Sequence, residues 1–96
     1  MGRHEVMEIL REHFPEMQRN GVRRLAVFGS TARDEATPES DVDILVEFEG
    51  PATLNGYMDL AFRLEELLGK RVDLVTVAAL KPRMRDSILH EAIDVS

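Results

Sequence analysis

The chain has 96 residues, of which 44% are hydrophobic and 31% charged, with a net charge of -6 and no cysteine. This length predicts a single domain over residues 1–96 whose small core gains from a partner, and it leaves self-association open. The composition excludes disulfides and thiolate metal sites, no apolar run is long enough to span a bilayer, and the acidic balance disfavours direct nucleic-acid binding. We expect a cytoplasmic protein, because the N-terminus lacks the apolar stretch of a signal peptide.

The N-terminal segment has the periodicity of an amphipathic helix. Apolar residues recur at helical spacing from Val6 to Met17, and Asn20-Gly21 supplies a stop signal. His13 lies on the apolar stripe, where no second His or carboxylate stands beside it at helical spacing. We therefore interpret His13 as a partly buried packing residue.

A buried strand and a tight turn come next. Residues 25–28 form a continuous apolar run, typical of a strand buried on both faces, and the run ends at Gly29-Ser30. Residues 31–36 predict a short helix with Ser30 at or near its N-cap. The backbone N–H groups and dipole at such a helix start attract phosphate, and glycine allows close approach, although most Gly-Ser pairs are simply turns.

The second strand, residues 42–48, alternates in polarity. Its apolar residues face one side, whereas Asp41 and Asp43 face the other with Cα atoms about 6.5 Å apart. Two carboxylates on one face can converge on a metal ion, and Mg²⁺ prefers such oxygen ligands and bridges them to phosphates. The alternative is an exposed acidic strand start, which is the more frequent role of an isolated Asp-x-Asp.

The remaining elements are a long helix, a third strand and a last helix. Residues 54–68 carry an apolar helical stripe, with Thr53 or Asn55 as the cap and Gly69 as the stop signal. A strand follows over residues 71–77, and Lys81-Pro82 opens the last helix. The fold class is therefore α/β (α+β), a small mixed sheet of about three strands packed by helices. The sequence does not determine the strand order.

Asp73 lies near the start of the third strand, which is otherwise apolar. If this strand is adjacent to the one that carries Asp41 and Asp43, three carboxylates converge. Such a set can hold two metal ions, one on a triphosphate and one that activates the attacking oxygen. Taken alone, an Asp at a strand edge is more often structural or solvated.

The spacing of Gly29-Ser30, Asp41-Val42-Asp43 and Asp73 resembles the DNA polymerase β-type nucleotidyltransferase superfamily, and most closely its minimal nucleotidyltransferases (MNT proteins). The similarity extends from about residue 25 to the end of the chain, and includes residues 67–75 and 88–92. The resemblance implies a nucleotidyltransferase (polymerase β-like palm) fold. It also implies transfer of a nucleoside monophosphate, AMP from ATP, to a hydroxyl.

The resemblance further implies a role for each motif residue. Gly29 and Ser30 would hold the triphosphate, Asp41 and Asp43 would bind Mg²⁺, and Asp73 would bind metal and help to activate the acceptor oxygen. Arg33 would contact phosphate, with a plain surface charge as an equal alternative. MNT proteins are commonly paired with a helical HEPN-type toxin, which they neutralise by binding or by adenylylating a tyrosine.

Three functions are compatible with these residues. The first is a Mg-dependent nucleotidyltransferase that acts on a hydroxyl of its toxin. The second is a non-catalytic antitoxin that neutralises the toxin by binding alone, because the chain has no second domain to hold the acceptor and the base. The third is transfer to RNA or to a small molecule such as an aminoglycoside, which the same missing domain disfavours.

Overall fold

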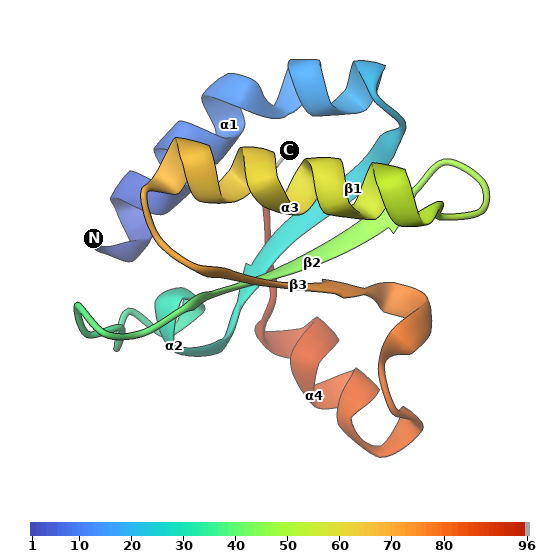
Figure 1. Cartoon of the computed structure of the whole chain (residues 1–96). Coiled ribbons are helices and arrows are strands. Elements are labelled where there is room, and N and C mark those ends of the chain that lie inside the picture. Colours follow the sequence, from blue (N-terminus) through green and yellow to red (C-terminus); the bar gives the residue numbers. More distant parts are fainter. Residues whose placement is uncertain (96) are drawn as a thin grey trace.

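The computed structural model describes residues 1–95, and Figure 1 shows how its helices and strands are arranged. In this part of the chain the elements are α1 (Arg3–Arg19), β1 (Val22–Phe28), α2 (Gly29–Ala32), β2 (Val42–Phe48), α3 (Leu54–Leu68), β3 (Val72–Thr76), the 3₁₀ helix η1 (Val77–Ala79), α4 (Pro82–Glu91) and β4 (Ile93–Asp94). No helix within these residues has the length and apolar character needed to cross a membrane.

The strands form one mixed sheet in the order β3-β2-β1-β4. β1 runs antiparallel to β2 and β4, whereas β2 and β3 are parallel, with α3 as the crossover between them. In this register Asp43 lies opposite Phe28 on one side and opposite Asp73 on the other. The end of β1 and the starts of β2 and β3 therefore meet at one end of the sheet.

Helices α1 and α3 cover one face of the sheet, above it in Figure 1. Alternate residues of the central strands point into this layer, including the fully buried Val27 and Ile44. The helices contribute Leu10 from α1 and Leu64 from α3, which are also fully buried. This layer contains the main hydrophobic core.

Helix α4 lies against the opposite face, below the sheet in Figure 1. The other set of alternate strand residues points there and forms a smaller cluster whose buried members are Ala26, Leu45 and Leu80. Ile88 and Leu89 of α4 are only partly buried against this cluster. The two faces of the sheet thus differ strongly in how much apolar surface they bury.

Several local predictions are confirmed with their physical causes. The predicted mixed sheet packed by helices is present, as are the strand over residues 42–48 and the helix over residues 54–68. Thr53 Oγ1 accepts the Gly56 N–H at 3.0 Å and caps the start of α3. Gly69 ends the helix in the left-handed region, with φ of +64°.

The structure corrects the helix expected over residues 31–36. This helix is the single turn α2, which begins at Gly29 with Phe28 in the N-cap position, so that Ser30 lies inside the turn. The chain leaves it at Asp34, whose φ is +59°, a left-handed conformation that Asp tolerates better than most residues. The fourth strand, β4, extends the sheet beyond the three strands expected.

Candidate active site

Gly29 marks the point where β1 ends and the chain turns sharply. Its φ is +70°, and a Cβ atom added at this position would lie 2.2 Å from Oδ2 of Asp43. Only glycine fits such a backbone conformation against such a close neighbour. The turn that sequence analysis assigned to phosphate binding is thus in van der Waals contact with a carboxylate assigned to metal binding.

Asp43 and Asp73 are paired across the parallel strands β2 and β3. Their neighbours Ile44 and Leu74 belong to the core under α1 and α3, so the two carboxyl groups face the α4 side. The predicted adjacency of the two strands is confirmed. Asp41 immediately precedes β2 and is exposed.

The carboxyl group of Asp43 lies in an electrostatically unfavourable place. Burial raises its pKa, the negative charges of Asp73 and Asp41 raise it further, and Arg33 opposes this rise. A cation between the carboxylates would remove the repulsion. Among residues 1–95, however, no three acidic or histidine side chains are close enough to hold a metal ion, so Asp41 does not join the Asp43–Asp73 pair in this arrangement.

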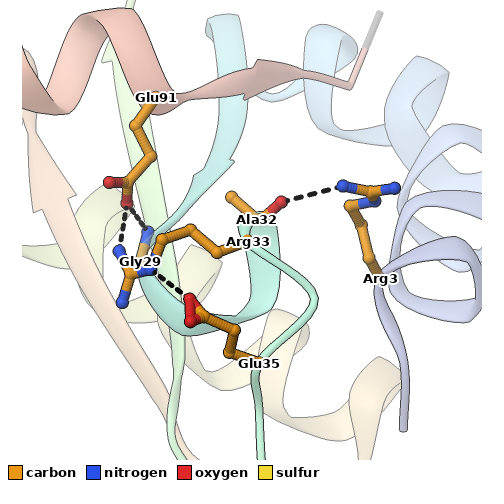
Figure 2. Close-up of polar contacts among 6 residues, drawn as sticks. All are labelled: Arg3, Gly29, Ala32, Arg33, Glu35 and Glu91. Carbon is orange, nitrogen blue, oxygen red and sulfur yellow. Dashed lines mark hydrogen bonds and ion pairs between the residues drawn. The ribbon is translucent and has the colours of Figure 1, made fainter.

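The N–H of Gly29 and the guanidinium of Arg33 share one acceptor, Oε1 of Glu91 (Figure 2). Arg33 Nη1 lies 3.0 Å from this oxygen, and Arg33 Nε donates to Glu35 Oε1 at 2.9 Å. Glu35 and Glu91 together raise the pKa of the Arg33 guanidinium. Glu91 was not among the predicted site residues, although it lies within residues 88–92, which share in the family resemblance, and is acidic in the last turn of a helix.

The other end of α2 is attached to the first helix. Arg3 Nη1 donates to the carbonyl oxygen of Ala32 at 3.1 Å, as Figure 2 shows, and the Arg3 N–H donates to Asp34 Oδ1 at 3.2 Å. A cation on the last carbonyl groups of a helix is favourable. The α2 turn is therefore held at both ends, by α4 and by α1.

A surface hollow of about 350 Å³ lies elsewhere. It opens between α1 and α3, where Met17, Leu60 and Arg63 contribute to its lining, and it contains none of the predicted site residues. The converging carboxylates are the stronger indicator of function, because the raised pKa of Asp43 has a specific charged partner beside a strained turn. The candidate site is an open acidic surface beside a turn.

Residues 5–95 match the family model of the nucleotidyltransferase domain. The chain belongs to this family. The nucleotidyltransferase is 46% identical over 92 residues to protein adenylyltransferase MntA of Thermococcus cleftensis, a match that covers 95% of this chain and 93% of the relative. It is also 45% identical to a solved structure described as a "putative minimal nucleotidyltransferase", with a TM-score of 0.84 and coverage of 97% and 95%.

The same fold occurs in a chain of a solved complex described as tri-AMPylated Shewanella oneidensis HEPN toxin with MNT antitoxin. The TM-score is 0.67 and the match covers 94% of the nucleotidyltransferase and 71% of that chain. At 17% identity this likeness concerns the fold alone. The minimal nucleotidyltransferase family and the enzyme class predicted from the sequence are confirmed.

The structure distributes the predicted site residues unevenly. Gly29, Asp43 and Asp73 lie together, and Ser30 follows Gly29 in the same turn. Asp41 and Arg33 are exposed at the margin of this group. The catalytic and ligand-binding roles of these residues stay predictions.

Proposed function

We propose that this nucleotidyltransferase transfers AMP from ATP to a protein hydroxyl, a tyrosine of a cognate HEPN-type toxin, and thereby acts as an antitoxin. The observation that carries the proposal is the contact between the Gly29 turn and Asp43, with Asp73 opposite in the parallel register. The proposal draws support from the adenylyltransferase relative and from the AMPylated toxin in the distant complex. The reaction belongs in the cytoplasm, where ATP is available.

The side chains of the site fit magnesium. The charges of Asp41 and Asp73 act on Asp43, and Glu35 and Glu91 contact the guanidinium of Arg33, which opposes them. The site thus has five carboxylates and one guanidinium, so its net negative charge repels a triphosphate. Divalent cations would neutralise this charge and allow the triphosphate to bind. Asp41, Asp43 and Asp73 would hold two Mg²⁺ ions. Bound Mg²⁺ neutralises phosphate charge and lowers the pKa of a coordinated hydroxyl.

The residues of the chain itself bind the substrate and accept the proton. The Gly29-Ser30 turn and Arg33 hold the triphosphate, and Asp73 orients the acceptor hydroxyl and receives its proton. The acceptor oxygen forms a bond to the α-phosphorus as the bond to pyrophosphate breaks, which completes the transfer. The open surface around the carboxylates leaves room for an acceptor that another protein presents.

The proposal is tested by incubating the protein with α-labelled ATP, Mg²⁺ and the product of an adjacent gene. Label should pass to that protein in the wild type and be lost in the double variant Asp41→Asn, Asp43→Asn. Tyr→Phe changes in the acceptor protein would identify the labelled hydroxyl. An absence of transfer, or transfer that survives the double variant, would refute catalysis.

An apolar stripe on α3 favours a second candidate function, neutralisation of the toxin by binding alone. Leu54, Met58 and Phe62 recur at helical spacing and are 73%, 42% and 61% exposed. They lie on a helix that covers the face opposite α4, away from the carboxylates (Figure 1). Exposed apolar side chains in a row mark protein-binding surfaces.

The two candidate functions are separated by variants on opposite faces. If binding suffices, the double Asp→Asn variant still neutralises the toxin at equal stoichiometry, whereas Phe62→Ser does not. If transfer is required, the double variant fails to protect cells while still forming a complex in size-exclusion chromatography. Leu54→Ser serves as a second test of the stripe.

A further inference from the structure

Glu91 occupies an electrostatically unfavourable position on its own helix. It is the last residue of α4, where the unpaired carbonyl groups carry partial negative charge that disfavours a carboxylate. Its compensation comes from outside the helix, from the Gly29 N–H and Arg33 Nη1. The side chain is only 26% exposed, although most of α4 is exposed. The contacts of Glu91 are therefore long-range and specific.

The Gly29 peptide is held between two carboxylates. Glu91 accepts its N–H on one side, and Asp43 lies in contact on the other, where a Cβ atom would meet Oδ2 at 2.2 Å. A hydrogen bond to a charged acceptor is stronger than one between neutral groups. Glu91 thus fixes the separation between the turn and the carboxylate of Asp43.

Glu91 also orients Arg33. The guanidinium donates through Nε to Glu35 and through Nη1 to Glu91, and Figure 2 shows both contacts. The guanidinium has five N–H donors, and these two contacts use only Nε and Nη1. Nη2 therefore has no partner among the residues that the structure describes. Arg33 would otherwise be a long, exposed side chain with many rotamers, and ordering it in advance lowers the entropy lost when it binds a ligand.

The end of the chain anchors Glu91 to the sheet. Ile93 and Asp94 pair with Val27 and Ala26 of β1, and the N–H of the buried Val95 donates to Leu25 at 2.8 Å. β1 is the strand that ends at Gly29. The strand that delivers the turn and the segment that carries Glu91 are thus hydrogen-bonded neighbours.

We infer that Glu91 is a positioning residue for nucleotide binding, which sets the Gly29 turn against Asp43 and aims Arg33 at the triphosphate. This inference rests on the proposed role of Gly29 and Arg33 in holding the triphosphate. It adds a contribution from the C-terminal helix to a site that sequence analysis built from residues 29–73. Both contacts of Glu91 go through Oε1 to groups that are proposed to hold the triphosphate, so its role is to position those groups.

The test compares Glu91→Ala, which loses both contacts, with Glu91→Gln, which retains an acceptor for the Gly29 N–H but loses the ion pair. Asp86→Asn is the matched control, because Asp86 is an exposed carboxylate on the same helix. For each variant, calorimetry measures the Kd of the protein for a non-hydrolysable ATP analogue in the presence of Mg²⁺. Transfer assays give KM and kcat, and thermal unfolding gives Tm.

We expect the Kd and the KM for nucleotide to rise about tenfold or more in Glu91→Ala, as for the loss of one charge-assisted hydrogen bond. The rise should be smaller in Glu91→Gln and absent in Asp86→Asn, with kcat changed less than threefold. An unchanged Kd with a lower Tm would overturn the inference, since Glu91 would then be only structural. A lower Kd would also overturn it, because the carboxylate would then merely compete with phosphate.

These measurements separate the inference from the function on which it rests. A wild type that binds the nucleotide more tightly than Glu91→Ala but transfers nothing would refute the proposed transfer and support the role of Glu91. A wild type that transfers AMP with the same Kd and KM as Glu91→Ala would refute only the role of Glu91. A wild type that binds no nucleotide would refute both.

Discussion

The two faces of the sheet use neighbouring residues of the same strands for different purposes. Ile44 points into the continuous core under α1 and α3, and Leu45 points into the small cluster under α4. Next to Leu45 on its face stands Asp43, opposite Asp73. One face is almost wholly apolar, whereas the other joins a small apolar cluster to converging carboxylates.

This difference indicates how a short chain accommodates an unstable site. Like charges that face each other lower stability, and a domain of this size has only about 5–15 kcal/mol in total. The apolar face supplies the burial that offsets the charges on the other. We therefore expect substitutions on the first face to act on stability and substitutions on the second to act on function.

The largest effect should come from truncating the core. Ile44→Ala should lower the free energy of unfolding by about 3–4 kcal/mol, because a fully buried side chain leaves a cavity in a tightly packed layer. Leu45→Ala, one residue away, should cost about 1 kcal/mol less, since its partly buried neighbours can relax. Urea unfolding measures both, and equal losses would contradict the distinction between the faces.

Gly29→Ala should act on activity more than on stability. The added Cβ would strike Asp43 and favour a different φ, which displaces the turn and should lower kcat/KM about 100-fold. Gly21→Ala is the control, because Gly21 has a φ of +95° but no atom within 4 Å of its added Cβ. It should cost about 1–2 kcal/mol of stability and leave transfer intact. A similar kcat/KM in Gly29→Ala and Gly21→Ala would contradict the proposed role of the contact between the Gly29 turn and Asp43.

Asp43→Asn should separate stability from function. The pKa of Asp43 is raised in the folded state above the ordinary Asp value of about 3.9. In the pH range between these two pKa values the folded protein therefore binds more protons than the unfolded chain. The stability of the metal-free wild type should therefore fall as the pH rises through this window, and Asp43→Asn should abolish the fall. At pH 7 in EDTA we expect a gain of less than about 1 kcal/mol, since partial exposure screens the repulsion. Asp43→Asn should also lose AMP transfer. A lower free energy of unfolding for Asp43→Asn than for the metal-free wild type at pH 7 would refute the prediction.

The smallest effect should come from the ion pair between α1 and α3. Arg63 Nε and Nη2 donate to the two carboxylate oxygens of Glu16 at 2.8 and 3.1 Å, a bond that lowers the pKa of Glu16. Because water screens this partly exposed pair, Arg63→Met should have only a small effect on stability and leave activity unchanged. A double-mutant cycle with Glu16→Gln measures the coupling energy, and a coupling as large as the loss in Ile44→Ala would contradict this prediction.

Local signals in the sequence were sufficient for much of the fold. The strand over residues 42–48 and the helix over residues 54–68 follow from alternation, a Thr53 cap and a Gly69 stop, all of which act within a few residues. The short helix was misplaced because Asp34 takes a left-handed conformation that no local pattern demanded. The two-residue strand β4 is too short to show any periodicity.

The candidate site was only partly predictable for the same physical reason. The types and spacing of Gly29, Asp41 and Asp43 indicate phosphate and metal chemistry, but the adjacency of Asp73 depends on strand order. The contact with Glu91 spans 62 residues and depends on how α4 and β4 return to β1. Such a contact follows from tertiary packing and leaves no local trace beyond an acidic residue at a helix end.

The position of β4 at the end of the described chain also bears on the order in which the protein matures during synthesis. The main core can begin to form once β1, β2 and α3 have emerged, whereas the Gly29 turn receives its partner only after Glu91 has been made. We expect the enzyme to reach its full affinity for nucleotide only after α4 and β4 have been made. Stalled chains that end at residue 90 should bind nucleotide at least about tenfold more weakly than chains that include β4, and equal affinity would contradict this order.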